Sequence, residues 1–221
     1  MKLSLLLLCL ASSLVAQAVR ARLEGRVPAA SIPSVDSLVG VAAAEGLPTE
    51  PLIQKAIEGG AKHVTGERIV KAVALNIEQL RQAKALLVRA GDAPPVTAVE
   101  VTAVASALKR GLAAPLVERI VAALPDQSRS SAFHALADLV AHRFNADSAA
   151  DLILAAVREG VRGLRLLDVS GAAIQELQRG RTHEEALARV RARLPNVPAA
   201  PTPARSAVQS ARRPTATGQR P

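Results

Sequence analysis

Two histidines and an aspartate at four-residue spacing have the clearest chemical potential in this sequence. His134, Asp138 and His142 lie in the segment HALADLVAH, within a stretch of helical periodicity at about 128–144. Residues four apart share one face of a helix, so Asp138 and either histidine could bind a divalent cation. A straight helix cannot bring all three to one ion, and a further ligand would have to come from elsewhere. A solvent-exposed polar face with an aspartate–histidine pair explains the same spacing.

No other motif points to catalysis or to a cofactor. Ser-His-Asp spacing, HExxH, a Walker loop and a dinucleotide-binding fingerprint do not occur. Gly59-Gly60 and Gly160…Gly163 lack the preceding strand of a phosphate-binding loop, and we interpret them as helix stops. His63 and His183 stand alone near predicted helix starts. We expect a non-catalytic protein without a cofactor, and a ligand- or metal-binding helical module is the alternative.

Apolar helices that end at a glycine recur along the chain. Three stretches, aligned on Gly46, Gly111 and Gly160, share an apolar helix, the glycine, a short linker and a second apolar helix. Glycine readily adopts the left-handed conformation that ends many helices, and no alternating β-branched run indicates a strand. The pattern predicts an all-α domain over 34–194, packed as a short α-solenoid or a compact helical array. It would have three irregular units of about three helices each (34–92, 97–145 and 147–194).

Capping residues predict where individual helices begin. In Thr97-Ala-Val-Glu100, the hydroxyl and the carboxylate can each accept a hydrogen bond from a main-chain N–H that lacks a helical partner. The same capping box occurs at Thr182 with Glu185. The predicted N-caps are Ser34, Thr49, Thr97, Asp147 or Ser148, and Thr182.

The first 18 residues have the features of a secretory signal peptide. A short apolar run is followed by the small residues Ala16 and Ala18, which fits cleavage after Ala18; cleavage after Ala21 is the alternative. The apolar run is too short to span a bilayer, which needs about 20 apolar residues. We therefore expect an exported protein, periplasmic or secreted, without a transmembrane segment in the mature chain. Residues 19–33 are predicted to form a poorly ordered lead.

Most of the net charge of +9 comes from the two ends of the chain. Between residues 27 and 194, twenty basic residues are nearly balanced by eighteen acidic ones. The chain has no Trp or Tyr and two Phe, so it lacks aromatic surfaces on which bases stack. We expect no specific nucleic-acid partner and instead another protein, bound through exposed helix faces. Arginines in residues 195–221 could add weak attachment to anionic envelope polymers or lipid head groups.

One segment resembles a pattern in other proteins. Residues 46–62, GLPTEPLIQKAIEGGAK, are similar to the pattern G-L-P-x-x-P-L-x-x-K-x-x-E-G-x-A-K of uncharacterised exported bacterial helical-repeat proteins. The resemblance implies a bacterial, exported origin and brings no activity with it. Ion pairs of Glu58 with Lys55 and Lys62 on one helix face account for the charges in this segment.

Residues 195–221 are predicted to be disordered and to contribute no stability. They contain six prolines, four arginines and no acidic residue, and they cannot bury enough apolar surface to fold. Deleting them should leave the melting temperature of the mature protein almost unchanged in differential scanning calorimetry. A large decrease would mean that this segment packs on the helical domain.

Overall fold

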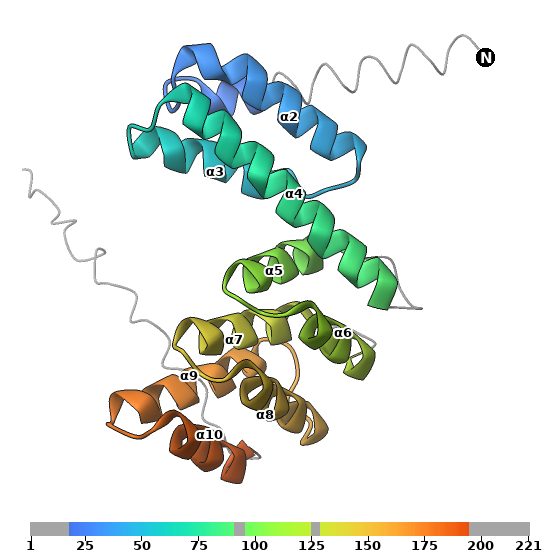
Figure 1. Cartoon of the computed structure of the whole chain (residues 1–221), viewed down its shortest axis with the longest axis vertical. Coiled ribbons are helices and arrows are strands. Elements are labelled where there is room, and N and C mark those ends of the chain that lie inside the picture. Colours follow the sequence, from blue (N-terminus) through green and yellow to red (C-terminus); the bar gives the residue numbers. More distant parts are fainter. Residues whose placement is uncertain (1–17, 91–95, 125–128, 195–221) are drawn as a thin grey trace, which may run out of the picture.

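The computed structural model describes residues 18–90, 96–124 and 129–194, and no strand occurs among them (Figure 1). The predicted all-α helical array is confirmed. The predicted disordered tail and all but the last residue of the predicted signal peptide lie outside the described residues. Residues 18–23 are helical. The elements that follow are η1 (Ala29–Ser31), α2 (Ile32–Ala44), α3 (Glu50–Ala61), α4 (Gly66–Ala90), α5 (Ala98–Lys109), α6 (Ala114–Ala123), α7 (Arg129–Ala141), α8 (Ala146–Arg158), α9 (Arg165–Gln178) and α10 (His183–Ala192).

The helices after α4 stack in two rows. Helices α5, α7 and α9 pack in sequence along one row, and α6, α8 and α10 pack along the other (Figure 1). The long helix α4 packs against α2 and α3 and also against α5 and α6, so it joins the N-terminal helices to the stack. Within the stack, α7 packs against α8 and α9 against α10 as hairpins, whereas α5 and α6 each pack against α4. The unit boundary expected near residue 146 falls between the two helices of the α7–α8 hairpin.

Six of the helices in the described part of the chain end in the same geometry, with one residue in the left-handed conformation. At the end of α2, Gly46 has a φ of 63°, and the N–H of Leu47 donates to the carbonyl oxygen of Ala42 at 2.9 Å. This bond gives a partner to a carbonyl that the helix leaves unpaired. The predicted stops at Gly46, Gly111 and Gly160 are confirmed. The left-handed residues that end α3, α5, α7, α8 and α9 are His63, Gly111, Arg143, Gly160 and Gly180.

The residue after the stop usually points into the core. Leu47, Leu112, Phe144 and Val161 each follow a left-handed residue, and all four are buried. Burying this side chain holds the turn against the hydrophobic core while the chain reverses direction. Each stop therefore positions the start of the following helix as well as ending its own.

Gly59 and Gly60 do not end α3, contrary to the sequence-based interpretation. A Cβ on Gly60 would lie 1.8 Å from the carbonyl oxygen of Arg26, and one on Gly59 would lie 2.7 Å from Cγ1 of Ile69. These two glycines let the N-terminal segment and α4 approach α3 closely. The helix ends at Ala61, and the left-handed residue that follows it is His63.

Both predicted capping boxes are confirmed. The hydroxyls of Thr97 and Thr182 each accept a hydrogen bond at 3.2 Å from the N–H of the glutamate three residues later, and each glutamate accepts the N-cap N–H at 3.0 Å. The predicted cap of α8 was wrong. Asn145 takes this role, because its Oδ1 accepts a hydrogen bond from the N–H of Ser148 at 3.0 Å, and Asp147 lies in the first turn.

Residues 19–33 are folded, so the predicted poorly ordered lead was wrong. Val19 and Leu23 are 6% and 0% exposed, and Val27 is also buried. Their four-residue spacing puts one apolar face of this segment on the core. Arg22 adds two hydrogen bonds to Glu50 of α3, at 2.6 and 2.7 Å. The two prolines and three arginines of the segment hid this apolar pattern in the sequence.

Replacing Gly111 by alanine should lower the free energy of unfolding by about 1 kcal/mol, because a Cβ is unfavourable at its φ of 98°. Gly171 is the matched control, since it lies inside α9 with open space where a Cβ would be. Gly171→Ala should raise the free energy of unfolding by up to about 1 kcal/mol, because alanine favours the helix. Urea denaturation measures both changes. Effects of the same sign would contradict the left-handed stop.

The pKa of Glu50 should depend on Arg22. Hydrogen bonds from Arg22 and Gln54 lower the pKa of Glu50 from 4.5 to about 2. Because the folded-state pKa is lowered, stabilisation by this carboxylate is complete above pH 4.5 and is lost as the pH falls toward 2. Arg22→Ala should return the pKa of Glu50 toward 4.5 in an NMR titration.

Glu58 is the internal control for this titration. Hydrogen bonds from Lys62 and Lys55 lower the pKa of Glu58 to about 2, and that pKa should not change in the Arg22→Ala variant. An unchanged pKa of Glu50 would show that Arg22 does not hold it in solution.

Candidate functional site

The residues predicted to bind a metal lie along α7 and its end. Asp138 Oδ1 accepts a hydrogen bond from Arg110 Nη1 at 2.7 Å, and Nδ1 of His142 lies 2.8 Å from the main-chain oxygen of Asp138. His134 is exposed on the same helix. Among the described residues, no group of three or more His, Cys, Asp or Glu side chains is placed to hold a metal ion. Asp138 and His142 instead contact protein groups that hold α7 and its end in place.

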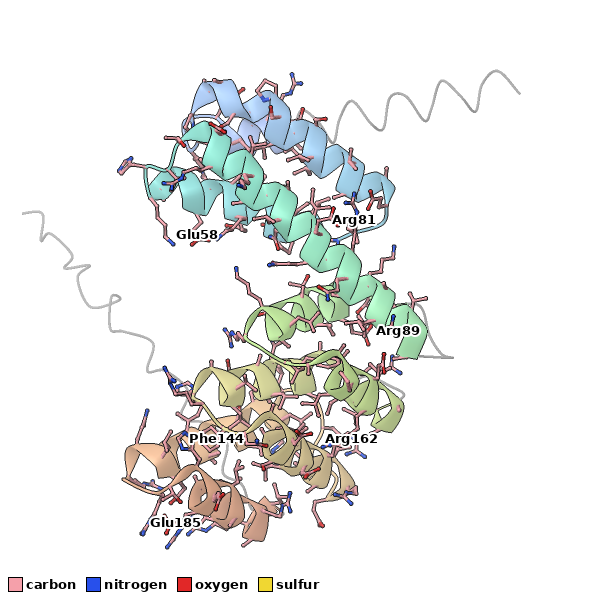
Figure 2. The ribbon with its side chains drawn as sticks, viewed as in Figure 1. Glu58, Arg81, Arg89, Phe144, Arg162 and Glu185 are labelled. Atoms are coloured by element: carbon pink, nitrogen blue, oxygen red, sulfur yellow. The ribbon has the colours of Figure 1, made fainter. Side chains whose placement is uncertain are left out.

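Ion pairs join α4 to α6 and α6 to α8. Nη2 of Arg89, near the C-terminal end of α4, lies 3.1 Å from Oε1 of Glu118 on α6. Figure 2 labels Arg89. Nη2 of Arg119 on α6 lies 2.7 Å from Oδ1 of Asp151 on α8. These side chains are largely exposed, so each pair contributes at most about 1 kcal/mol. The pairs favour one register between neighbouring hairpins, and they account for these charges without a ligand.

His183 connects α10 to the preceding hairpin. Its Nε2 lies 3.0 Å from the carbonyl oxygen of His142, and its ring meets that of Phe144 edge to face with centroids 4.8 Å apart. The sequence placed His183 only near a helix start. No local pattern reveals a contact between residues 41 positions apart.

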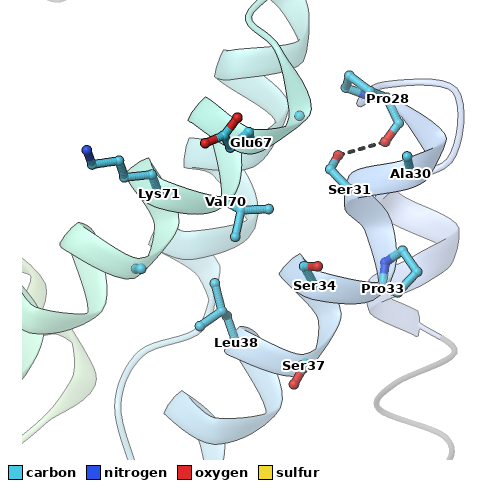
Figure 3. A pocket seen from close by; sticks show the side chains of 12 residues that line it. Pro28, Ala30, Ser31, Pro33, Ser34, Ser37, Leu38, Glu67, Val70 and Lys71 are labelled. Carbon is cyan, nitrogen blue, oxygen red and sulfur yellow. Dashed lines mark hydrogen bonds between the residues drawn. The ribbon is translucent and has the colours of Figure 1, made fainter.

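A groove of about 980 Å³ opens between η1 and α2 on one side and the first half of α4 on the other (Figure 3). Leu38 of α2 and Val70 of α4 extend into the space between the two helices, and both are half-buried. The remaining walls are formed mainly by small side chains, which leave the groove open. These are Ala30, Ser31, Ser34, Ser37, Gly66 and Ala74.

Each of the two helices also carries an exposed apolar side chain outside the groove lining. Val41, one turn after Leu38 on α2, is 46% exposed, and Leu75, beside Ala74 on α4, is 57% exposed. The α2 side of the groove is uncharged: the single charged residue of α2 is Asp36, which pairs with Arg20. The low charge of α2 is visible in the sequence, since Asp36 is its one charged residue. Helical periodicity alone did not show that part of this helix lies on the surface.

Two charged side chains stand on the α4 wall of the groove. Glu67 and Lys71 are exposed and lie four residues apart on one helix face. Neither forms an ion pair with another described residue. Ser31, by contrast, is satisfied within its own turn, since its hydroxyl donates to the carbonyl oxygen of Pro28 at 2.6 Å. Glu67 and Lys71 are therefore the charges that this groove offers to a ligand.

Among the described helices, none combines the length and apolar character that crossing a membrane requires. Comparisons of the chain with protein-family models, with curated proteins and with solved structures found no match. A functional assignment must therefore follow from the groove and its surroundings.

Proposed function

We propose that this chain is an exported, non-catalytic interaction module that binds an α-helix of another protein in the groove between α2 and α4. The observation that carries the proposal is the open groove between Leu38 and Val70. The same two helices also carry the exposed side chains of Val41 and Leu75. Exposed apolar surface often marks a protein-binding site. Covering it contributes about 25 cal/mol for each Å² of apolar surface removed from water.

The walls of the groove favour a helix over other peptide conformations. Both walls are helical, so they offer no strand edge to which an extended peptide could add. Among the residues that the structure describes, no aromatic side chain lines the groove to hold a proline-rich segment, and no arginine cluster is there to hold a phosphate. An amphipathic helix, in contrast, can place apolar side chains between the small residues of α2 and α4. This is the mode of binding that the lining residues support.

Glu67 and Lys71 define the charge pattern of the partner. A helix lying along α4 would place its flanking residues near these two exposed side chains. Opposite charges across an interface raise the association rate and select the orientation of the partner. We therefore infer a partner helix with a basic residue opposite Glu67 and an acidic residue opposite Lys71.

The proposed location is the bacterial envelope or the medium outside the cell. The support for it is the signal-peptide pattern of the first 18 residues and the resemblance of residues 46–62 to exported proteins. The arginines of residues 195–221 would add weak, salt-sensitive attachment to anionic surfaces. The folded helices would supply the specific contact.

Photo-crosslinking from the groove tests this proposal. A photoreactive residue replaces Ser37 in the full chain, and adducts are identified after irradiation of the native envelope fraction. Lys71→Glu should reduce the yield of one discrete protein adduct about fivefold, the equivalent of about 1 kcal/mol. Reversing the facing acidic residue of the identified partner should restore that yield.

Arg68→Glu is the matched control, because Arg68 is exposed on the same helix but does not line the groove. This variant should leave the adduct yield unchanged. An equal loss in both variants would indicate a general charge effect and would contradict binding in the groove. Absence of any protein adduct from Ser37 would also overturn the proposal.

A further inference from the structure

The first residues after the predicted signal peptide are packed as part of the fold. We call residues 19–27 the N-terminal clasp. Within it, Val19 is 6% exposed and Leu23 is fully buried. The clasp also passes so close to α3 that a Cβ on Gly60 would collide with the carbonyl oxygen of Arg26. The folded domain thus includes side chains directly beyond Ala18.

Arg20 neutralises a carboxylate that is largely buried. Its Nε lies 2.7 Å from Oδ2 of Asp36 on α2, and the Asp36 side chain is 9% exposed. Removing one partner of such a pair leaves the other charge poorly solvated, which destabilises the fold more than loss of an exposed pair. The contact of Arg22 with Glu50, in contrast, joins two partly exposed groups.

The two candidate cleavage sites differ in what they leave of these contacts. Cleavage after Ala18 retains the whole clasp, and it has small residues at both recognition positions, Ala16 and Ala18. Cleavage after Ala21 would remove Val19 and Arg20. That product would lose a buried apolar side chain and the charge that faces Asp36.

We propose that the exported precursor is cut between Ala18 and Val19, and that Val19 and Arg20 are structural residues of the mature protein. This inference rests on the export part of the proposed function. In the reaction, water adds across the peptide bond: the bond between the carbonyl carbon of Ala18 and the nitrogen of Val19 breaks. Ala18 becomes a carboxylate at the end of the released leader, and Val19 gains a free α-amino group.

The site is tested by expressing the full-length precursor in an exporting bacterium and measuring the intact mass and N-terminal sequence of the product. A mature chain that begins at Val19 is expected. A chain that begins at Arg22 would overturn the inference and leave export standing. A full-length chain that keeps its leader would overturn export as well.

The structural role is tested with two mature chains, one beginning at Val19 and one at Arg22. The shorter chain should melt about 4 °C or more below the longer one, because it lacks a buried side chain and the partner of Asp36. Arg20→Ala in the longer chain should reproduce part of this decrease. Arg26→Ala is the control, because Arg26 is exposed and makes no ion pair with a described residue; it should leave the melting temperature unchanged. Equal melting temperatures for the two mature chains would overturn the structural role of Val19 and Arg20.

Discussion

Reversal of the chain at the end of each helix is the constraint on which this array depends. A helix leaves carbonyl groups unpaired at its C-terminal end, and in a packed array several of these ends lie against the core. At Gly46, Gly111 and Gly160 a left-handed residue turns the chain, so that the next N–H can donate back to a carbonyl near the helix end. The apolar side chain that follows each of these glycines then enters the core. The same few atoms satisfy the backbone and direct the next helix.

Glycine is not required at every one of these stops. His63 and Arg143 adopt positive φ values of 53° and 65° at the ends of α3 and α7. A residue with a Cβ meets a steric penalty in this conformation, and the surrounding contacts must offset it. At Arg143 the following residue is the buried Phe144, which packs against the ring of His183. Packing of the neighbouring hairpins thus compensates for a locally unfavourable residue.

The groove lies at the N-terminal end of the array, where α2 and the first half of α4 leave a shared face uncovered (Figures 1 and 3). Further along, α4 packs against α5 and α6, which lie beside its second half (Figure 1). Apolar side chains such as Leu38 and Val70 are consequently only half-buried. The absence of charge on the α2 wall is what distinguishes this open end from an ordinary solvated surface, and it supports a partner there.

The amino-acid sequence alone determined the helical class, most helix ends and both capping boxes, because these depend on residues within a few positions of one another. Gly111 and the Thr97–Glu100 box are examples, since local sterics and hydrogen bonding decide them. Tertiary structure decided which helices pair, why Gly60 has no side chain and why residues 19–33 are ordered. It also placed Arg110 against Asp138, and so gave the aspartate of the predicted metal face a partner within the protein. These outcomes depend on packing between segments far apart in the chain, and helical periodicity records only that a face is apolar, not what covers it.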